Sequence, residues 1–192
     1  MFSQRESDVL WAFNFVLMLL PFNFQRWLEE HRHELVPPVG NKNLSPDSED
    51  YIVMVVAGPN ARKDYHYNET DEFFFQLEGR ITVRTQVDGH VVDHTLEAGD
   101  MFLCPARTPH SPIREAGSIG LVIERKRAGK GFTDGLMWFC DTCNHPLHAA
   151  YFELKNIETD FLPHFQTYYN DAQLRTCTKC GTTMDTDPRF VK

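Results

Sequence analysis

The sequence predicts a mostly β protein with one small antiparallel barrel or sandwich, a short helix before it and a small C-terminal module with four cysteines. Short apolar or alternating segments recur between residues 51 and 125. Turn residues separate them at nearly regular spacing, as in barrels and sandwiches. The 192 residues suffice for one sizeable core and a smaller module. Two Cys-x-x-Cys pairs near the C-terminus have the spacing of metal ligands.

Composition and charge exclude several classes of protein. Hydrophobic residues at 42% and charged residues at 24% are close to globular averages, which indicates a folded chain without extensive disorder. Lys and Arg number 19 against 27 Asp and Glu, a net charge of −8, and no long basic run is present. Such a chain offers little to a phosphate backbone, so we expect no nucleic-acid partner.

The N-terminal residues 1–20 form an apolar extension of uncertain status. The apolar run within it is shorter than the roughly 20 residues that cross a bilayer, so we expect no membrane span. Acidic residues Glu6 and Asp8 and the lack of a small-residue cleavage site argue against a signal peptide. Two interpretations stay open: an extension that packs on the body or on a second subunit, or translation that begins at Met18.

The next elements are a helix and a loop. Residues 22–36 predict a short amphipathic helix, because apolar Phe24 and Trp27 lie among charged residues and two prolines follow. Residues 41–50 are polar and predict a loop. From residue 51 onward, strands are expected.

Strands account for the middle of the chain. Residues 81–87 alternate apolar and polar side chains and end at Asp88-Gly89, a hairpin dipeptide. A second turn is expected at residues 97–100. The predicted strands are residues 51–56, 73–77, 81–87, a return strand that opens at Val91, 101–103 and 120–125.

The composition changes at residue 128, where glycines become frequent, so we divide the chain into a barrel, residues 21–127, and a C-terminal module, residues 128–192. Between the two cysteine pairs, apolar residues recur at helical spacing and predict a helix whose apolar face packs on the barrel. These residues are Leu154, Ile157, Phe161 and Phe165.

The two cysteine pairs can place four thiolates around one ion. The ligands would be Cys140, Cys143, Cys177 and Cys180. Four sulfurs suit tetrahedral Zn²⁺ or iron and leave no open position, which indicates a structural site. A nucleic-acid-binding ribbon is the alternative, and scattered basic residues argue against it. Thiolate ligands also favour a reducing compartment. The fifth cysteine, Cys104, is expected to be a small buried hydrophobic residue.

A second metal site is suggested by His66, Glu72 and His110. Two imidazoles and one carboxylate leave open positions on a divalent ion, as in ferrous sites that bind a substrate and dioxygen together. By residue type alone, solvated histidines and one acid in a run of acids explain the pattern at least as well. Flanking glycines and prolines shift the balance toward the metal site.

The spacing of these residues resembles the two motifs of the cupin superfamily of small β-barrels. The matching residues are Gly58, His66, Glu72 and Gly79 in the first motif and Gly99, Pro105 and His110 in the second. Two residues depart from it: Asp64 replaces a common first histidine, and Arg114 replaces a common asparagine. Five strings are similar to the 3-hydroxyanthranilate 3,4-dioxygenase family: PPVGN, GPNARKDYH, EFFFQLEG, PHSPIR and LVIER. The C-terminal cysteines resemble the bacterial and fungal form of that family.

The resemblance covers most of the chain from Pro21 onward, and it implies both a fold and a function. The fold would be a single cupin barrel, a double-stranded β-helix or jelly roll, with a C-terminal rubredoxin-like site for Zn²⁺ or iron. The enzyme would be a cytoplasmic homodimer with catalytic Fe²⁺, a non-haem extradiol-type dioxygenase. It would convert 3-hydroxyanthranilate and O₂ to 2-amino-3-carboxymuconate semialdehyde. That product cyclises to quinolinate, a precursor of NAD in the kynurenine route of tryptophan breakdown.

Carried over by position, the resemblance also implies residue roles. His66, Glu72 and His110 would hold the iron, and Glu72 would border the substrate. Arg62 would lie beside dioxygen. Arg114 and Glu124 would bind the substrate, since the guanidinium offers a planar fork to a carboxylate.

Alternatives remain for residues and for function. Glu124 could instead form a surface ion pair with Arg125, worth ~0–1 kcal/mol. Another metal-dependent cupin enzyme is a second possible function. A non-catalytic sensor that binds a small acid is a third.

Overall fold

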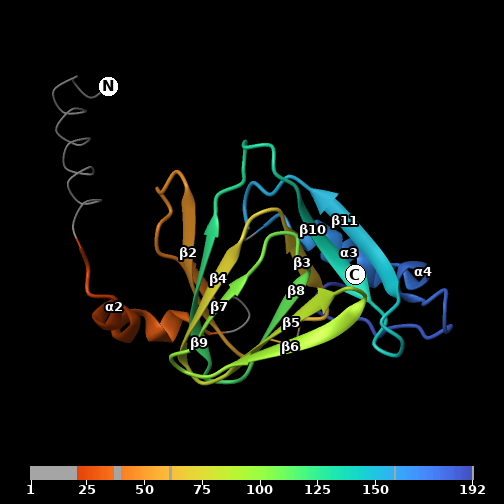
Figure 1. Ribbon diagram of the computed structural model, residues 1–192, viewed down its shortest axis with the longest axis horizontal. Helices are drawn as coiled ribbons and strands as arrows, with labels where there is room; N and C mark the ends of the chain where they lie inside the picture. Colours follow the sequence, from red (N-terminus) through yellow and green to blue (C-terminus); the bar gives the residue numbers. More distant parts are fainter. Residues whose placement is uncertain (1–20, 37–39, 61, 158, 192) are drawn as a thin grey trace. The chain divides into compact units, whose positions relative to one another are not determined.

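The computed structural model describes residues 21–36, 40–60, 62–157 and 159–191 (Figure 1). The extension expected at residues 1–20 lies outside the described residues. The chain divides into two compact units, Met1–Glu34 and Leu35–Lys192. Within the described ranges, no helix has the length and apolar character needed to cross a membrane.

The first unit contains the predicted N-terminal helix. Helix α2, Phe24–His31, is followed by the 3₁₀ helix η1, Arg32–Glu34. Asn23 caps α2, because its side-chain oxygen accepts a hydrogen bond of 2.9 Å from the backbone N–H of Arg26. The helix buries Leu28. The expected short helix is therefore confirmed.

The second unit contains two antiparallel sheets, as predicted. The first has the strand order β1-β2-β9-β4-β7, with β1 at Asn41–Asn43, β2 at Tyr51–Ala57, β9 at Ile119–Arg125, β4 at Glu72–Glu78 and β7 at Met101–Cys104. The second has the order β11-β10-β3-β8-β5-β6, with β11 at Pro146–Phe152, β10 at Asp134–Phe139, β3 at Tyr65–Asn68, β8 at His110–Arg114, β5 at Ile81–Val87 and β6 at His90–Leu96. All the strands expected between residues 51 and 125 are present.

Several elements were not foreseen. The polar residues 41–43 pair with β2 and form β1, where the sequence predicted a loop. Strands β3 and β8 are short, and both contain polar or proline residues that hide their alternation. Strand β10 pairs with both β3 and β11, so the second sheet continues into the C-terminal segment. The domain boundary at residues 127 and 128 stays a prediction, and the sheet runs across it.

The helix predicted between the cysteine pairs is shorter than expected. Helix α3 begins at Leu162 and ends at Asn170, and the short α4 spans Ala172–Arg175. Leu154 and Ile157 precede α3, so placing them on a helical face was wrong. Both still serve the core, since Leu154 is buried and Ile157 packs against the barrel interior. Burial, not helical periodicity, explains their spacing.

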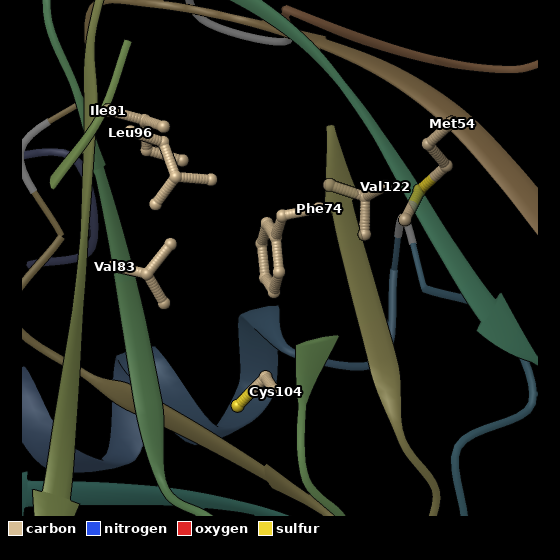
Figure 2. Close-up of a cluster of buried hydrophobic side chains, with 7 residues drawn as sticks. All are labelled: Met54, Phe74, Ile81, Val83, Leu96, Cys104 and Val122. Atoms are coloured by element: carbon tan, nitrogen blue, oxygen red, sulfur yellow. The ribbon is translucent and has the colours of Figure 1, made fainter. Parts of the chain in front are cut away.

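The barrel core lies between the two sheets (Figure 2). Phe74 from β4 and Val122 from β9 face Ile81 and Val83 from β5. Phe74 and Ile81 are each 1% exposed, and burying one such side chain contributes ~1.5–3 kcal/mol. Cys104 is buried in the same cluster, as predicted. The packed sheets hold the three strands β3, β4 and β8 that carry the candidate ligands.

A second cluster joins the C-terminal helices to the sheet. Leu136 and Trp138 on β10 pack with Tyr168 and Tyr169 on α3. The Trp138 and Tyr168 rings are stacked, with centroids 4.3 Å apart. Through these contacts, α3 covers the strand that pairs with β3.

Candidate metal and substrate site

The three candidate metal ligands come from both sheets. His66 on β3 pairs directly with His110 on β8, and Glu72 begins β4 in the opposite sheet. They are 5%, 2% and 6% exposed, respectively. Residues separated by up to 44 positions in the sequence therefore meet inside the barrel, and the predicted cluster of two histidines and a carboxylate is present.

In His66 and in His110, the two ring nitrogens face different partners. His110 Nδ1 lies 2.9 Å from the carbonyl oxygen of Thr108, and its Nε2 lies 3.0 Å from Glu72 Oε2. His66 Nε2 lies 2.9 Å from Asp134 Oδ1, and its Nδ1 lies 3.8 Å from Glu72 Oε2. Each ring thus uses one nitrogen to fix its orientation and turns the other toward the carboxylate of Glu72.

This donor set fits a divalent cation. The three ligand atoms lie within 4.8 Å of one another. Two neutral imidazoles and one carboxylate are the ligands of ferrous dioxygenase sites, which keep positions open for substrates. Asn68 Nδ2 donates a hydrogen bond of 3.0 Å to Glu72 Oε2 and holds that side chain in place. The three residues and their support therefore suit a divalent metal ion.

Electrostatics favour the ionised carboxylate. Burial raises the pKa of Glu72, but the adjacent His110 and His66 outweigh this and hold the pKa at about 2. Burial lowers the pKa of His66 and favours its neutral form. For His110, burial lowers the pKa, and the charge of Glu72 more than reverses the effect. Glu72 is thus ionised near neutral pH, as a metal ligand must be.

Arg114 is a buried cation that forms no ion pair with a carboxylate among the described residues. It ends β8, is 2% exposed, and its Nη1 donates a hydrogen bond of 3.4 Å to Gln76 Oε1. Its Nε has no hydrogen-bond partner among the described residues. A Cβ on Gly120 would lie 2.9 Å from Arg114 Nη1, so this glycine leaves room for the guanidinium. A buried, unpaired guanidinium is suited to an incoming anion.

Glu124 lies across from Glu72, because their positions pair on β9 and β4. It is 2% exposed, and its Oε2 lies 2.8 Å from Arg127 Nη1. Arg125 is exposed, so the alternative of a surface Glu124–Arg125 pair is wrong. Burial, followed by the charge of Glu72, raises the pKa of Glu124 to about 7 despite Arg127.

Arg62 is anchored by Asp64. Its Nε lies 3.2 Å from both carboxylate oxygens of Asp64, and its Nη2 also contacts Oδ2. The guanidinium carbon lies 6.0 Å from the centre of the Phe161 ring, which packs 5.3 Å from the ring of His66. Asp64 replaces the common cupin histidine, and here it holds an arginine beside the site.

Sequence reasoning missed part of this surrounding shell. Asp134 and Arg127 are fully buried and lie behind His66 and Glu124. Phe161 was expected to pack only on the barrel, and it packs against His66. Asp134 and Phe161 follow residue 128 and sit in the segment assigned to another module. The sequence did carry a signal for Asp134, because it directly precedes the apolar residues 136–139. An acid at the start of a buried strand is itself buried and therefore needs a partner.

The four cysteines also converge as predicted. Cys140 Sγ lies 3.6 Å from Cys180 Sγ, and Cys143 Sγ lies 3.6 Å from Cys177 Sγ. In each pair a backbone N–H bonds back to the carbonyl of the first cysteine, from Asn144 to Cys140 and from Gly181 to Cys177. The two turns form a closed four-sulfur cluster with no position left for a substrate.

Comparison with known proteins now bears on both sites. A family model described as 3-hydroxyanthranilic acid dioxygenase matches residues 17–169. The chain belongs to this family. The family resemblance drawn from the motifs is thereby confirmed, and the match extends through His66, Glu72, His110 and the first cysteine pair.

Individual members of the family are similar over nearly their whole length. The chain is 54% identical over 165 residues to 3-hydroxyanthranilate 3,4-dioxygenase of Xanthomonas euvesicatoria pv. vesicatoria (strain 85-10), covering 86% of this chain and 92% of that protein. It is 51% identical over 175 residues to the enzyme of the same name from Xanthomonas campestris pv. campestris (strain 8004), covering 91% and 98%. A solved cupin-2 domain protein from Shewanella frigidimarina aligns at 22% identity and a TM-score of 0.42, covering 54% of this chain and 93% of that one.

Proposed function

We propose that this protein is a ring-opening dioxygenase that converts 3-hydroxyanthranilate and O₂ to 2-amino-3-carboxymuconate semialdehyde. The observation that carries the proposal is the buried site of His66, Glu72 and His110 in the same barrel as Arg114, a buried cation that lacks an anion. The family match supports the same substrate and reaction.

The substrate has two recognisable ends. Its adjacent hydroxyl and amino groups suit a metal with open positions, and its carboxylate suits a guanidinium. When bound, Fe²⁺ supplies a centre at which an aromatic ring with two such donors and dioxygen react together. Two neutral imidazoles and one carboxylate leave that ion a net positive charge, which favours substrate donors that can lose a proton.

Arg114 would bind the substrate carboxylate. Its Nε is an unused donor, and no carboxylate forms an ion pair with it among the described residues, so the substrate would supply the missing charge. Burial lowers the pKa of Arg114 to about 10, and the charge of Glu72 partly opposes this fall. The side chain is therefore charged at neutral pH. Two parallel hydrogen bonds would then fix the ring relative to the metal.

Glu124 would act on the aromatic substrate, and Arg62 would act on dioxygen. Arg127 contacts one oxygen of Glu124, which leaves the other to accept a proton or a hydrogen bond from a ring substituent. A pKa of about 7 suits a group that exchanges a proton near neutral pH. Arg62, oriented by Asp64, would present its positive charge beside dioxygen.

The wider role follows from the product. We propose that the semialdehyde cyclises to quinolinate, which places the reaction in the kynurenine route to NAD, and that the enzyme works as a cytoplasmic homodimer. The closed cysteine cluster would hold structural Zn²⁺ or iron. Elemental analysis and sedimentation of the purified protein would measure the metal content and the subunit number.

Reconstitution tests the proposal directly. The protein is loaded anaerobically with ferrous iron, then mixed with 3-hydroxyanthranilate and air. We expect oxygen uptake in proportion to substrate and a new product that absorbs in the near ultraviolet. If an iron-loaded, folded protein consumes neither reactant, the dioxygenase proposal is rejected in favour of a non-catalytic protein that binds a small acid.

A further inference from the structure

A buried ion network lies behind the metal and substrate residues. Arg127 is 2% exposed and sits between two carboxylates, Asp134 at 0% exposure and Glu124 at 2%. Its Nη2 lies 2.8 Å from Asp134 Oδ1, and its Nη1 lies 2.8 Å from Glu124 Oε2. One guanidinium therefore bridges two acids that belong to different strands, β10 and β9.

Each acid points onward to a different part of the site. Asp134 Oδ1 lies 2.9 Å from His66 Nε2, so this oxygen contacts both the histidine and Arg127. Glu124 pairs in register with Glu72 across β9 and β4. The network thus has one arm toward a metal ligand and one arm toward the proposed substrate-binding residue.

We propose that Asp134 and Arg127 are a positioning pair for this site. Asp134 fixes the ring and the tautomer of His66, and Arg127 holds Asp134 and Glu124 in their working positions. The His66 arm rests on the metal site itself. The Glu124 arm rests on the proposed function.

The tautomer follows from hydrogen-bond chemistry. An ionised carboxylate only accepts hydrogen bonds, so the His66 nitrogen facing Asp134 must carry the proton. That nitrogen is Nε2, which leaves the lone pair on Nδ1, the atom that faces Glu72. A histidine ligand requires such a lone pair, and a carboxylate behind the ring commonly provides it.

Arg127 makes the arrangement stable inside the barrel. A lone buried carboxylate would avoid ionisation, because desolvation disfavours the charged form. Arg127 Nη2 lies 2.8 Å from Asp134 Oδ1, so the guanidinium supplies the counter-charge that a buried carboxylate needs. The guanidinium also donates from Nε to both oxygens of Asp134 at 3.0 Å, which fixes the plane of the carboxylate.

A purely structural role is the competing explanation. Arg127 and Asp134 flank the connection between β9 and β10, and their ion pair could simply close it. Loss of such a pair would lower stability without changing the metal affinity of the molecules that stay folded. The two explanations therefore separate on iron affinity, measured without substrate.

The test variant is Asp134→Asn. An amide keeps the shape but can turn a donor toward His66, which would move the ring proton to Nδ1 and block ligation. We expect Fe²⁺ affinity, measured anaerobically by chelator competition, to fall about 10–100-fold, with the metal of the cysteine cluster retained. The matched control is Val83→Ala, which removes buried methyl groups from the barrel core and should lower the melting temperature without changing iron affinity.

Arg127→Lys tests the second arm and covers the case in which Asp134→Asn does not fold. A lysine keeps the charge but cannot bridge both acids as a fork does. We expect weaker Fe²⁺ binding together with a raised KM for 3-hydroxyanthranilate. Iron affinity within twofold of wild type in the folded variants, or an equal loss in Val83→Ala, would overturn the positioning role. If Arg127→Lys binds Fe²⁺ more weakly but has a normal KM, the proposed role of Arg127 in positioning Glu124 would be rejected.

Discussion

At the scale of single residues, the charges of the barrel differ in how they are paired. Arg62 and Arg127 are neutralised by Asp64 and by two acids, respectively. Arg114 is buried with no acid beside it among the described residues, although burying a charge without a partner is costly. Such a residue persists where a ligand supplies the counter-charge, which is why we assign the substrate carboxylate to Arg114.

The metal ligands give the first prediction. His66→Ala, His110→Ala and Glu72→Ala should each abolish turnover while leaving the barrel folded, because an open site contributes reactivity more than scaffold. Metal analysis should show loss of iron with the four-thiolate metal retained. Full activity in any one of the three variants would remove that residue from the ligand set.

Arg114 gives the second prediction. Arg114→Ala should remove a charge-assisted interaction of ~1.5–3 kcal/mol, about 10–150-fold in kcat/KM for 3-hydroxyanthranilate. Arg114→Lys should recover only part of this, because an ammonium cannot form two parallel hydrogen bonds. Steady-state kinetics on the iron-loaded variants measure both effects.

A truncated substrate provides the control. The compound 2-aminophenol keeps the two adjacent donors but lacks the carboxylate, so wild type should turn it over poorly. Arg114→Ala should be no worse than wild type on it. A large further loss would mean that Arg114 shapes the metal site or the fold, and its role as a carboxylate clamp would be withdrawn.

At the scale of elements, strand β10 serves both metal sites. Its first residue, Asp134, contacts His66, and Cys140 directly follows its last residue. Helix α3 packs on this strand through Trp138 and Tyr168. The cysteine cluster therefore lies at one end of the strand whose other end contacts His66, where a bound metal would tie β10 to the C-terminal segment.

The third prediction concerns the cysteine cluster. Cys177→Ser should lower the melting temperature or the yield of dimer, because a four-thiolate site stores folding free energy in its metal bonds. Turnover per iron should survive in the folded fraction, since the cluster has no open position. A folded Cys177→Ser protein that binds iron normally yet fails to react would contradict a structural role.

At the scale of the whole molecule, the two sheets bring Glu72 next to two histidines, and the resulting stabilisation of the fold depends on pH. Glu72 has a pKa of about 2 in the folded protein, held down by His110 and His66 against the effect of burial. In the unfolded chain it titrates near its ordinary value of 4.5. Its stabilisation is therefore complete above pH 4.5 and is lost as the pH falls toward 2.

This gives the fourth prediction. The free energy of unfolding of metal-free protein, measured by denaturant titration, should fall steadily between pH 4.5 and pH 2. In Glu72→Gln the fall should be smaller, because the amide does not titrate. An identical pH dependence in both proteins would show that Glu72 is not held ionised by its histidines.

Much of the fold follows from local patterns. The apolar strand at Phe73–Leu77, the alternation of residues 81–87 and the Asp88-Gly89 turn each report on their own neighbourhood, and all appear as predicted. Strand β3 was missed because its partners β8 and β10 are remote in sequence. Strands β10 and β11 pair with each other as near neighbours, but they lie in the segment that we assigned to the cysteine module. Their residues are polar, proline-containing or separated by glycine, so tertiary contacts override weak local preference.

The sequence alone predicted the two residue clusters that the structure brings together, because the residue types and their spacing lie within short motifs. The tertiary structure decided how that chemistry is supported. It left Arg114 Nε without a hydrogen-bond partner among the described residues. It paired Glu124 with Arg127 and not with Arg125, and it placed Asp134 beside His66, 68 residues away in the sequence. Such partners depend on which strands become neighbours in the sheet, and that is set by packing over the whole chain.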